Sequence, residues 1–230
     1  MPAIQIKQRP FMTCPELFQD IPAFIAEILA RRGVASTQEL ELKLKHLLAP
    51  SLKGLNEAIQ LMDAAIDQQH KIVIVGDYDA DGATSTALMI LALREMGAQV
   101  EYLVPDRFKY GYGLTPAIAD LAFTSFTPDL LITVDNGISS HDGVKQAQDH
   151  GMQVIITDHH LTTKPTPSAQ AVVNPNQLGC DFPSKALAGV GVAFYVLANL
   201  STYRKKLHKS SAVMSQYLDL VALGTYADVA

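Results

Sequence analysis

The stretch GDYDADG, residues 76–82, places three aspartates at every second position directly after a short apolar run. Asp77, Asp79 and Asp81 carry like charges, which repel one another at this spacing. Removing them from water is costly unless a positive group lies among them. A metal ion satisfies that requirement if other parts of the chain supply further ligands. The spacing therefore predicts one part of a metal site.

Two further apolar runs also end in groups that bind metals. LLITV, residues 130–134, is followed by Asp135, and QVIIT, residues 153–157, is followed by Asp-His-His at 158–160. In open α/β sheets, ligands bind at the carboxyl ends of the strands. An aspartate also caps helices, and capping would be the favoured explanation for Asp135 taken alone. Three strands that deliver Asp or His to one edge favour a shared site.

The residue types indicate which ion this site would hold. Carboxylates with one or two imidazoles suit manganese or magnesium, whereas a structural zinc site favours thiolates. Cys14 and Cys180 are far apart and lack metal-binding spacing, so packing is the favoured role for both. Because side chains alternate in an extended segment, we expect His159 and His160 to point in different directions, one at a metal and one at a substrate.

The elements that position these groups change character at Lys71. From there, short β-branched runs at 71–75, 99–104, 130–134 and 153–157 alternate with helical patterns at 83–96, 116–125, 140–150, 186–200 and 211–223. This alternation predicts an α/β fold, a parallel β-sheet flanked by helices. Residues 1–70 are predicted to form an N-terminal helical segment that packs on this core, with helices at 14–33, 36–48 and 56–70.

Composition limits the class of protein. The 230 residues are 48% hydrophobic and 18% charged, which is typical of a globular protein. The longest apolar stretches fall short of the ~20 residues that a membrane helix needs, and the N-terminus lacks a secretory pattern. We therefore expect a cytoplasmic protein. The net charge of −5 gives no general attraction to nucleic acid, so any such contact must be local.

Several motifs together resemble a known family. GDYDADG, VDNGISS and TDHH occur in that order, followed by VVNPN, ALAGVGVAFYV and LDLVALGTYADVA. The series is similar to the DHH phosphoesterase superfamily, and more narrowly to its bacterial exonucleases that degrade single-stranded DNA from the 5′ end. The resemblance covers nearly the whole chain. It implies a DHH catalytic α/β domain over 71–230, with the C-terminal lobe of the family absent from this chain.

The resemblance implies roles for particular positions. The positions that match the family's metal ligands are Asp79, Asp81, Asp135, His159 and Asp228. Asp135 holds the place that bridges two ions. Asp228 is preferred to Asp219 because the closing motif of the family ends in an aspartate after a small-residue strand. Asp77 and His160 match catalytic positions near the reacting phosphate, where His160 would stabilise developing charge or assist proton transfer.

At one position, Val75, the sequence departs from many members, which have a metal-binding histidine there. One ion site keeps a full set of ligands: Asp81, Asp135, His159 and Asp228. The neighbouring site keeps only Asp79 and Asp135, together with substrate oxygens and water. We therefore expect one tightly held Mn²⁺ or Mg²⁺ and a second, weaker ion that enters with substrate. The metal would neutralise the phosphodiester and activate the attacking water.

The loop VPDRFKYGYGL, residues 104–114, is the candidate for substrate binding through Arg107, Lys109, Tyr110, Gly111 and Tyr112. It combines cations for phosphate, glycines for close approach and aromatic rings for base stacking. The spacing alone leaves an ordinary solvated loop equally open. The resemblance favours substrate binding, because Arg107 matches a residue expected to contact the 5′ phosphate.

Three minor motifs have more ordinary explanations. The basic run at 203–209 is expected to be a solvated helix end. The glycines at 186–193 favour helix packing or close approach to nucleic acid over a dinucleotide site, because no predicted strand leads directly into them. Asn174 and Asn176 are expected to orient the histidines, with turn formation as the alternative.

The resemblance implies a metal-dependent exonuclease that releases 5′-mononucleotides from single-stranded DNA in repair and recombination. The alternatives are another DHH phosphoesterase, acting on short oligonucleotides, cyclic dinucleotides or pyrophosphate, or a non-catalytic replication-associated relative. Such a relative should have lost several ligands, and here only position 75 is in question. The implied partners are single-stranded DNA with a 5′ end, a single-strand-binding protein and a helicase, and the protein is expected to be a monomer.

Overall fold

The structure is a computed structural model that describes residues 7, 10, 21–41 and 43–229. Its contacts divide the chain into two units, Met1–Ala49 and Pro50–Ala230. The described elements of the smaller unit are helix α1 (Ala23–Arg31) and the 3₁₀ helices η2 (Thr37–Leu40) and η3 (Leu44–His46). Of the predicted helix over 14–33, residues 14–20 lie outside the described residues, and the described part is helical from Ala23 to Arg31.

The prediction of one helix over 36–48 is wrong, because two short 3₁₀ helices occupy this range. Leucines at 40, 42 and 44 alternate with charged residues in the sequence. That period of two suits an extended chain and not the 3.6-residue period of an α-helix. Glu41, between the two short helices, accordingly has extended backbone angles.

The predicted parallel sheet is confirmed. Its strands are β1 (Lys71–Gly76), β2 (Gln99–Leu103), β3 (Leu130–Val134), β4 (Gln153–Thr157) and β5 (Ala171–Val173), in the order β2-β1-β3-β4-β5. All neighbouring pairs are parallel. The four longer strands match the predicted runs, whereas β5 was not predicted because three residues are too few to show a period.

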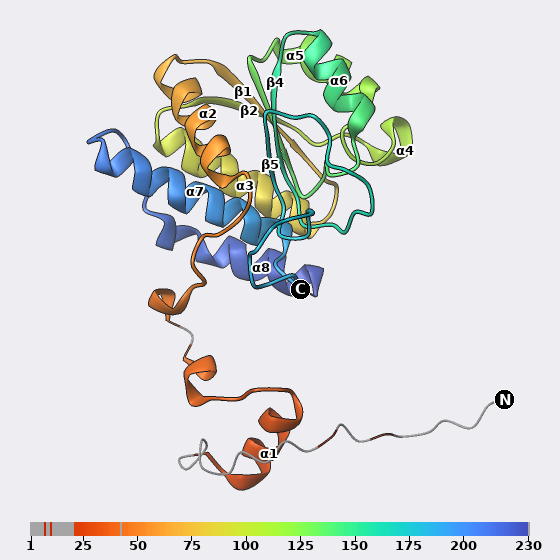
Figure 1. The fold of residues 1–230 in the computed structure, drawn as a ribbon. Coiled ribbons are helices and arrows are strands. Elements are labelled where there is room, and N and C mark those ends of the chain that lie inside the picture. The colour runs from red at the N-terminus through yellow and green to blue at the C-terminus, as the bar shows by residue number, and fades with distance from the viewer. Residues whose placement is uncertain (1–6, 8–9, 11–20, 42, 230) are drawn as a thin grey trace, which may run out of the picture. The chain divides into compact units, whose positions relative to one another are not determined.

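Helices cover both faces of this sheet (Figure 1). One face carries α2 (Leu55–Asp67), α3 (Ala80–Glu95), α7 (Gly189–Lys206), η4 (Met214–Tyr217) and α8 (Leu218–Asp228), and the other carries α5 (Pro116–Phe126) and α6 (His141–Asp149). The short helix α4 (Arg107–Tyr110) lies in the loop that follows β2. Alternation along β1 sends Ile72 and Ile74 to the first core and Val73 and Val75 to the second.

Two element boundaries differ from the sequence pattern in ways that matter for the site. Helix α3 begins at Ala80, three residues earlier than predicted, because the Asp79 side chain caps it by accepting a hydrogen bond from Gly82 N at 2.9 Å. Helix α8 continues to Asp228, so this aspartate is the last residue of a helix and does not follow the small-residue strand that was expected. Helix α2 belongs to the main core, and the larger unit therefore begins at Pro50, before the change of pattern at Lys71.

None of the helices in the described part of the chain is long and apolar enough to cross a bilayer.

The basic run at 203–209 is not simply solvated. Arg204 is 3% exposed, and its Nη1 atom lies 2.5 Å from Asp63 Oδ1 and 3.1 Å from Asp67 Oδ1, so it joins α7 to α2. Lys209 also pairs with both aspartates, whereas Lys205 and Lys206 are exposed. The physical reason is that α7 packs on α2 through its last turn, which brings one cation inside.

Replacing Arg204 with methionine is expected to lower the free energy of unfolding by about 3 kcal/mol, since Asp63 would keep only Lys209 as a partner at a mostly buried position. Urea unfolding followed by circular dichroism measures this change. Lys205→Met is the matched control on the neighbouring exposed position, and we expect it to stay within about 0.5 kcal/mol of the parent. Equal effects of the two substitutions would contradict a structural role for Arg204.

Candidate metal centre

The carboxyl ends of three strands bring the acidic and imidazole groups together. Gly76 of β1 pairs with Val134 of β3, which pairs in turn with Thr157 of β4. The three chains therefore leave the sheet at the same level. The residues that follow them include Asp77 and Asp79, then Asp135, then His159 and His160.

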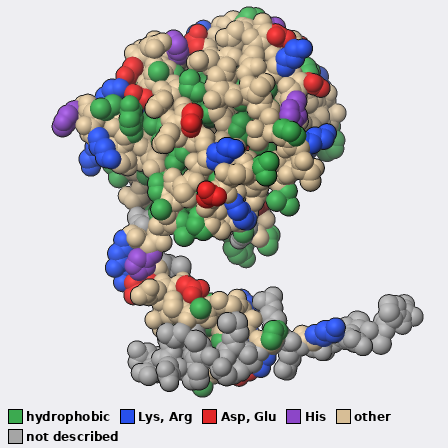
Figure 2. All heavy atoms as spheres, viewed as in Figure 1, with side chains coloured by type: hydrophobic (Ala, Val, Ile, Leu, Met, Phe, Trp, Pro, Cys, Tyr) green, Lys and Arg blue, Asp and Glu red, His purple; other side chains and the backbone are tan. Residues whose placement is uncertain are grey.

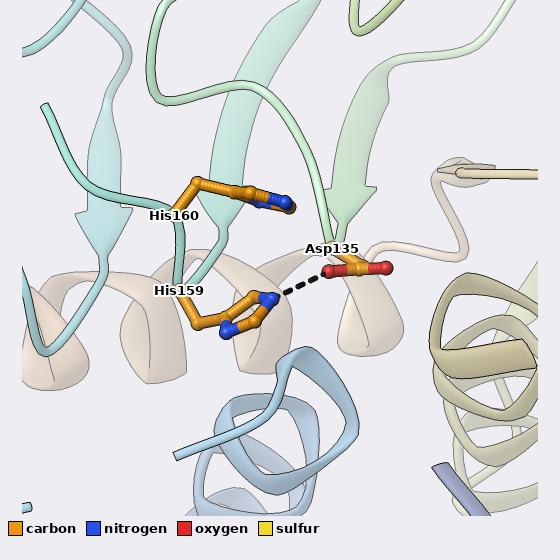
Figure 3. Close-up of side chains that lie close together, drawn as sticks. All are labelled: Asp135, His159 and His160. Atoms are coloured by element: carbon orange, nitrogen blue, oxygen red, sulfur yellow. Dashed lines mark ion pairs between the residues drawn. The ribbon is translucent and has the colours of Figure 1, made fainter. Parts of the chain in front are cut away.

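Asp135 and His159 form the closest pair of this centre. Figure 3 shows the His159 ring directed at the Asp135 carboxylate, and His159 Nε2 lies 3.1 Å from Asp135 Oδ1. Asp135 is 2% exposed and the His159 side chain is 14% exposed. Burial raises the pKa of Asp135 to about 7, and the negative charges of Asp81 and Asp79 act in the same direction. Ionising this carboxylate is unfavourable mainly because it is buried, and a bound cation would offset that cost.

Asp81 faces the same space from the first turn of α3. Its two carboxylate oxygens accept hydrogen bonds from the first amides of α7, Gly189 N at 2.6 Å and Val190 N at 2.8 Å. Burial raises the pKa of Asp81 above its usual value, although these two amides act in the opposite direction. His159 Nε2 lies 3.8 Å from Asp81 Oδ2. The start of α7 therefore fixes this carboxylate beside the histidine.

The glycine at the start of α7 is required by close packing. A Cβ atom at position 189 would lie 2.7 Å from Asp135 Oδ1 and 2.8 Å from Asp135 Cβ. Gly189 of the motif at 186–193 thus allows close packing within the chain, against a carboxylate, and the close approach to nucleic acid considered from the sequence stays a prediction.

We expect Gly189→Ala to weaken manganese binding about 10-fold, because the added methyl group must displace the Asp135 side chain. Isothermal titration with Mn²⁺ measures the affinity. Gly191→Ala is the matched control on the same helix, since the three atoms nearest to its Cβ would all belong to the Leu187 side chain and none to a proposed metal ligand. Unchanged affinity in Gly189→Ala would show that Asp135 does not need its present position.

Asp228 closes the centre from the last residue of α8. Its Oδ2 atom lies 3.8 Å from His159 Nδ1. Gly224 allows α8 to approach α3 closely, because a Cβ there would lie 2.3 Å from Thr84 Oγ1. Asp219 is in the first turn of the same helix, nine residues earlier, which corresponds to about 13 Å along the axis. The structure thus brings Asp228 to the histidine and leaves Asp219 at the other end of α8.

These donor atoms fit a divalent cation. Three groups have ligand atoms within 4.8 Å of one another: Asp135, His159 and His160; Asp81, His159 and Asp228; and Asp77, Asp79 and Asp135. Asp135 Oδ1 and His159 Nε2 are buried and lie 3.1 Å apart, and within the part of the chain that the structure describes neither makes a contact with hydrogen-bond geometry. Buried polar atoms are rarely left unpaired. The pair is therefore suited to coordinate an ion.

His160 lies beside His159 rather than opposite to it. The two ring centroids are 4.5 Å apart, and both rings lie near Asp135 in Figure 3, so the expectation that they point in different directions is wrong. The segment after β4 is not extended, because the backbone amides of His159 and His160 both donate to Asp158 Oδ1, at 2.7 and 3.0 Å. The turn around Asp158 places both imidazoles on one side.

The partners of His160 differ from those of His159. His160 Nδ1 lies 2.7 Å from Asp158 Oδ1, and His160 Nε2 lies 3.2 Å from the hydroxyl of Tyr112. The hydrogen bond that His160 Nδ1 donates to Asp158 raises the pKa of His160 to about 9. His160 is therefore a cation near neutral pH, with one N–H fixed by Asp158 and the other directed at the loop.

Sequence reasoning missed the role of Asp158. It is 1% exposed, and besides the His159–His160 segment it accepts a hydrogen bond from Ile138 N at 2.8 Å. Although burial alone would raise it, these hydrogen bonds hold the pKa of Asp158 below its usual value. The sequence did contain a signal for this role, because Asp158 is the aspartate of the DHH motif. A buried carboxylate needs hydrogen-bond donors, and the two histidines that follow it can supply them.

Asn174 and Asn176 hold the same segment from the other side. Asn174 Nδ2 donates to the carbonyl of His160 at 3.0 Å, and Asn176 Nδ2 donates to the carbonyl of His159 at 2.5 Å. Asn176 N also donates to Asn174 Oδ1 at 2.6 Å, which closes a turn. Both of the roles considered from the sequence, orientation of the histidines and turn formation, are present.

The loop over 104–114 contributes two of its candidates to the centre. Arg107 Nη2 lies 2.9 Å from Asp77 Oδ1 and 4.0 Å from Asp79 Oδ2, and its guanidinium carbon lies 5.9 Å from the centre of the Tyr112 ring. Gly111 has a φ angle of 81°, a left-handed conformation that suits glycine and turns the chain back toward Tyr112.

The other candidates of this loop lie differently. Lys109 Nζ lies 4.9 Å from the centre of the Tyr110 ring. Among the described residues, this amine forms no ion pair with a carboxylate of the metal centre. Tyr110 packs against the core on the α5 and α6 face, and its carbonyl accepts a hydrogen bond from Thr115 Oγ1 at 3.0 Å. Tyr110 therefore anchors the loop.

Val75 is buried in the core between the sheet and α5 and α6. Its side chain is 1% exposed. Its backbone carbonyl accepts a hydrogen bond from Asn136 Nδ2 at 3.1 Å. Position 75 therefore serves packing in this chain.

Comparisons with known proteins agree with this geometry. A family model described as "DHH family, N-terminal domain" matches residues 71–225. The chain is 45% identical, over 98% of its length, to the "Single-stranded-DNA-specific exonuclease RecJ" of Escherichia coli strain K12, and it covers 40% of that protein. It therefore spans well under half the length of such relatives.

Solved structures show the same fold. A structure of RecJ in complex with Mn²⁺ from Thermus thermophilus matches with a TM-score of 0.71 and 35% identity, covering 88% of this chain and 28% of that one. A structure of RecJ in complex with Mg²⁺ from the same organism matches with a TM-score of 0.57 and 32% identity, covering 88% and 24%.

Proposed function

The chain belongs to the DHH family, and we propose on this basis that it carries the hydrolytic centre of a metal-dependent exonuclease that degrades single-stranded DNA from the 5′ end. One observation carries the proposal: buried carboxylates that follow or begin separate strands and helices gather around Asp135 Oδ1 and His159 Nε2, a buried pair 3.1 Å apart that lacks hydrogen-bond geometry. The RecJ names of the relatives supply the substrate class.

The proposed ligands of the metal are Asp79, Asp81, Asp135, His159 and Asp228. Relatives were solved with Mn²⁺ and with Mg²⁺, and this mixture of carboxylates and imidazole suits either ion. When bound, such an ion supplies Lewis-acid neutralisation of phosphate oxygens and lowers the pKa of water. Tight binding is assigned to Asp81, Asp135, His159 and Asp228, and weaker binding to Asp79 and Asp135, whose ligand atoms lie within 4.8 Å of one of Asp77.

The side chains around this centre have separate tasks in the proposal. Arg107 receives the terminal 5′ phosphate, because a guanidinium binds phosphate oxygens in pairs. His160, held as a cation by Asp158, donates a hydrogen bond from Nε2 to the phosphate undergoing attack and stabilises the charge that develops there. Tyr112, beside both groups, offers a ring on which the first base stacks.

The distribution of charge on the surface is compatible with binding of DNA at a local site. On the face of the larger unit drawn in Figure 2, basic side chains lie in small groups among acidic and apolar ones. The net charge is −5. Neither observation indicates a broad basic surface on this face, and we propose that a DNA strand binds through a few contacts at the centre.

The cellular setting follows from the same likeness. We propose action in DNA repair and recombination in the cytoplasm, as a monomer, on strands made available by a helicase and a single-strand-binding protein. The described helices are all too short or too polar to cross a membrane, which is compatible with this setting.

The test compares 5′-phosphorylated single-stranded and duplex oligonucleotides incubated with Mn²⁺, with a chelator as the control. We expect mononucleotides to be released from the 5′ end of the single strand alone, and the chelator to abolish release. Release from the 3′ end, or faster hydrolysis of dinucleotides or pyrophosphate, would favour another DHH phosphoesterase. Because the chain spans 40% of its relative, Mn²⁺ binding is measured in parallel.

A further inference from the structure

Asn136 ties together the ends of two strands that carry the proposed ligands. The residue follows Asp135 directly and is 2% exposed. Its Nδ2 atom donates to the carbonyl of Val75 at 3.1 Å and to the carbonyl of Val134 at 2.9 Å. These carbonyls belong to β1 and β3. One amide nitrogen therefore bridges the two strands at the edge where the metal centre lies.

The two hydrogen bonds of Asn136 lie at the carboxyl ends of β1 and β3, where the sheet ends. Gly76 and Val134 are the last paired residues of β1 and β3. Beyond them, β1 continues into the segment of Asp77 and Asp79, while β3 continues into Asp135. The amide of Asn136 therefore continues the connection between the strands at the point where their ladder ends.

The backbone next to this amide is in an uncommon conformation. Asp135 has a φ angle of 59°, in the left-handed region that residues other than glycine rarely adopt. Three hydrogen bonds hold it: Asp135 N to the carbonyl of Thr157 at 3.0 Å, Thr133 Oγ1 to the carbonyl of Asn136 at 2.7 Å, and Thr157 Oγ1 to the carbonyl of Thr133 at 2.7 Å. The orientation of Asp135 thus depends on buried polar groups of β3 and β4.

The chemistry of the amide explains why asparagine stands here. A primary amide places two N–H donors on one nitrogen, whereas a serine or threonine hydroxyl has one donor. Asn136 Oδ1 has no partner among the described residues, so its donors are the part of the group in use. A buried acceptor left unpaired is unfavourable. An asparagine at this position, despite its unpaired oxygen, indicates that the two hydrogen bonds from its nitrogen stabilise the strand ends.

Resting on the proposed function, we propose that Asn136 is a positioning residue that sets the separation between the Asp77–Asp79 segment and Asp135, and thereby the affinity for the second divalent ion. The ligand atoms of these three carboxylates lie within 4.8 Å of one another. Asp135 also belongs to the tight set, but the other members of that set, Asp81, His159 and Asp228, are held by the start of α7 and by α8. The two ion sites therefore depend on Asn136 to different extents.

The test is a Mn²⁺ titration followed by electron paramagnetic resonance of the free ion, with thymidine 5′-monophosphate present to supply phosphate oxygens. For Asn136→Ala we expect the weak site to lose at least about 10-fold in affinity while the tight site changes less than about 2-fold. Asn136→Ser, which keeps one donor, is expected to fall between the parent and Asn136→Ala. It also serves as the test variant if Asn136→Ala does not fold.

The controls separate positioning from a general loss of structure. Asn199→Ala removes an amide that donates to the carbonyl of Tyr195 within α7, and it should leave both affinities unchanged. A parallel fall of both affinities together with the melting temperature would overturn the proposal, and so would unchanged weak-site binding. A parent protein with one Mn²⁺ site would also overturn it. Since the titration needs no hydrolysis, failure of the exonuclease assay is a separate result.

Discussion

Replacing Asp135 with asparagine is expected to lower the rate of hydrolysis of single-stranded DNA by about 1,000-fold or more. The carboxylate is shared by two of the three candidate ligand groups, and loss of even an outer partner of a metal site typically costs about 10- to 100-fold. Asparagine keeps the size of the side chain and tolerates the left-handed backbone found at this position. The substitution therefore removes charge with little change of shape. Single-turnover kinetics with a 5′-labelled oligonucleotide measure the effect.

Asp149→Asn is the matched control for this prediction, because it makes the same chemical change at an exposed position at the end of α6. It should retain full activity. Activity of Asp135→Asn within 10-fold of the parent at saturating Mn²⁺ would mean that Asp135 is not a ligand, and that its raised pKa reflects burial alone.

His160→Gln is expected to lower the rate of the chemical step by about 100- to 10,000-fold while Mn²⁺ affinity stays within a few-fold of the parent. The reason is that Asp158 holds His160 as a cation whose remaining N–H faces Tyr112 and the substrate side, whereas His159 faces Asp135 and Asp81. Glutamine can donate a hydrogen bond but carries no charge. Rapid-quench kinetics and a metal titration on the same preparation separate the two quantities.

His141→Gln, at the exposed start of α6, is the control and should behave as the parent. The informative alternative is a large loss of Mn²⁺ affinity in His160→Gln. Asp135, His159 and His160 have ligand atoms within 4.8 Å of one another, so that result would make His160 a ligand in place of a group that acts on the phosphate.

Much of the fold was predictable because its signals are local. Buried parallel strands are continuous apolar runs such as LLITV, and four of the five strands were identified from them. The failures came where local pattern was short or misleading. Strand β5 has three residues, and the region around η2 and η3 combines helix-forming residue types with an alternation of two.

The candidate site was predictable in its membership but not in its connections. The rule that ligands gather at the carboxyl ends of parallel strands predicts from the sequence alone that Asp135 and His159 lie close together. Contacts between segments that are far apart in the chain leave no such pattern in the sequence. The hydrogen bond between Tyr112 and His160, the bonds of Asp81 to the start of α7, and the bridge made by Asn136 all depend on packing of segments far apart in the sequence.

The ion pair between Arg107 and Asp77 has a consequence for how substrate and metal affect each other. Arg107 Nη2 lies 2.9 Å from a carboxylate that belongs to one of the candidate cation sites. A cation that binds Asp77 competes with the guanidinium, and a phosphate that binds Arg107 competes with the carboxylate. Each ligand thus releases the binding group of the other, and by thermodynamic linkage the benefit is reciprocal. The free protein holds its two binding groups as each other's counterions, so phosphate and the second metal ion should bind with positive cooperativity.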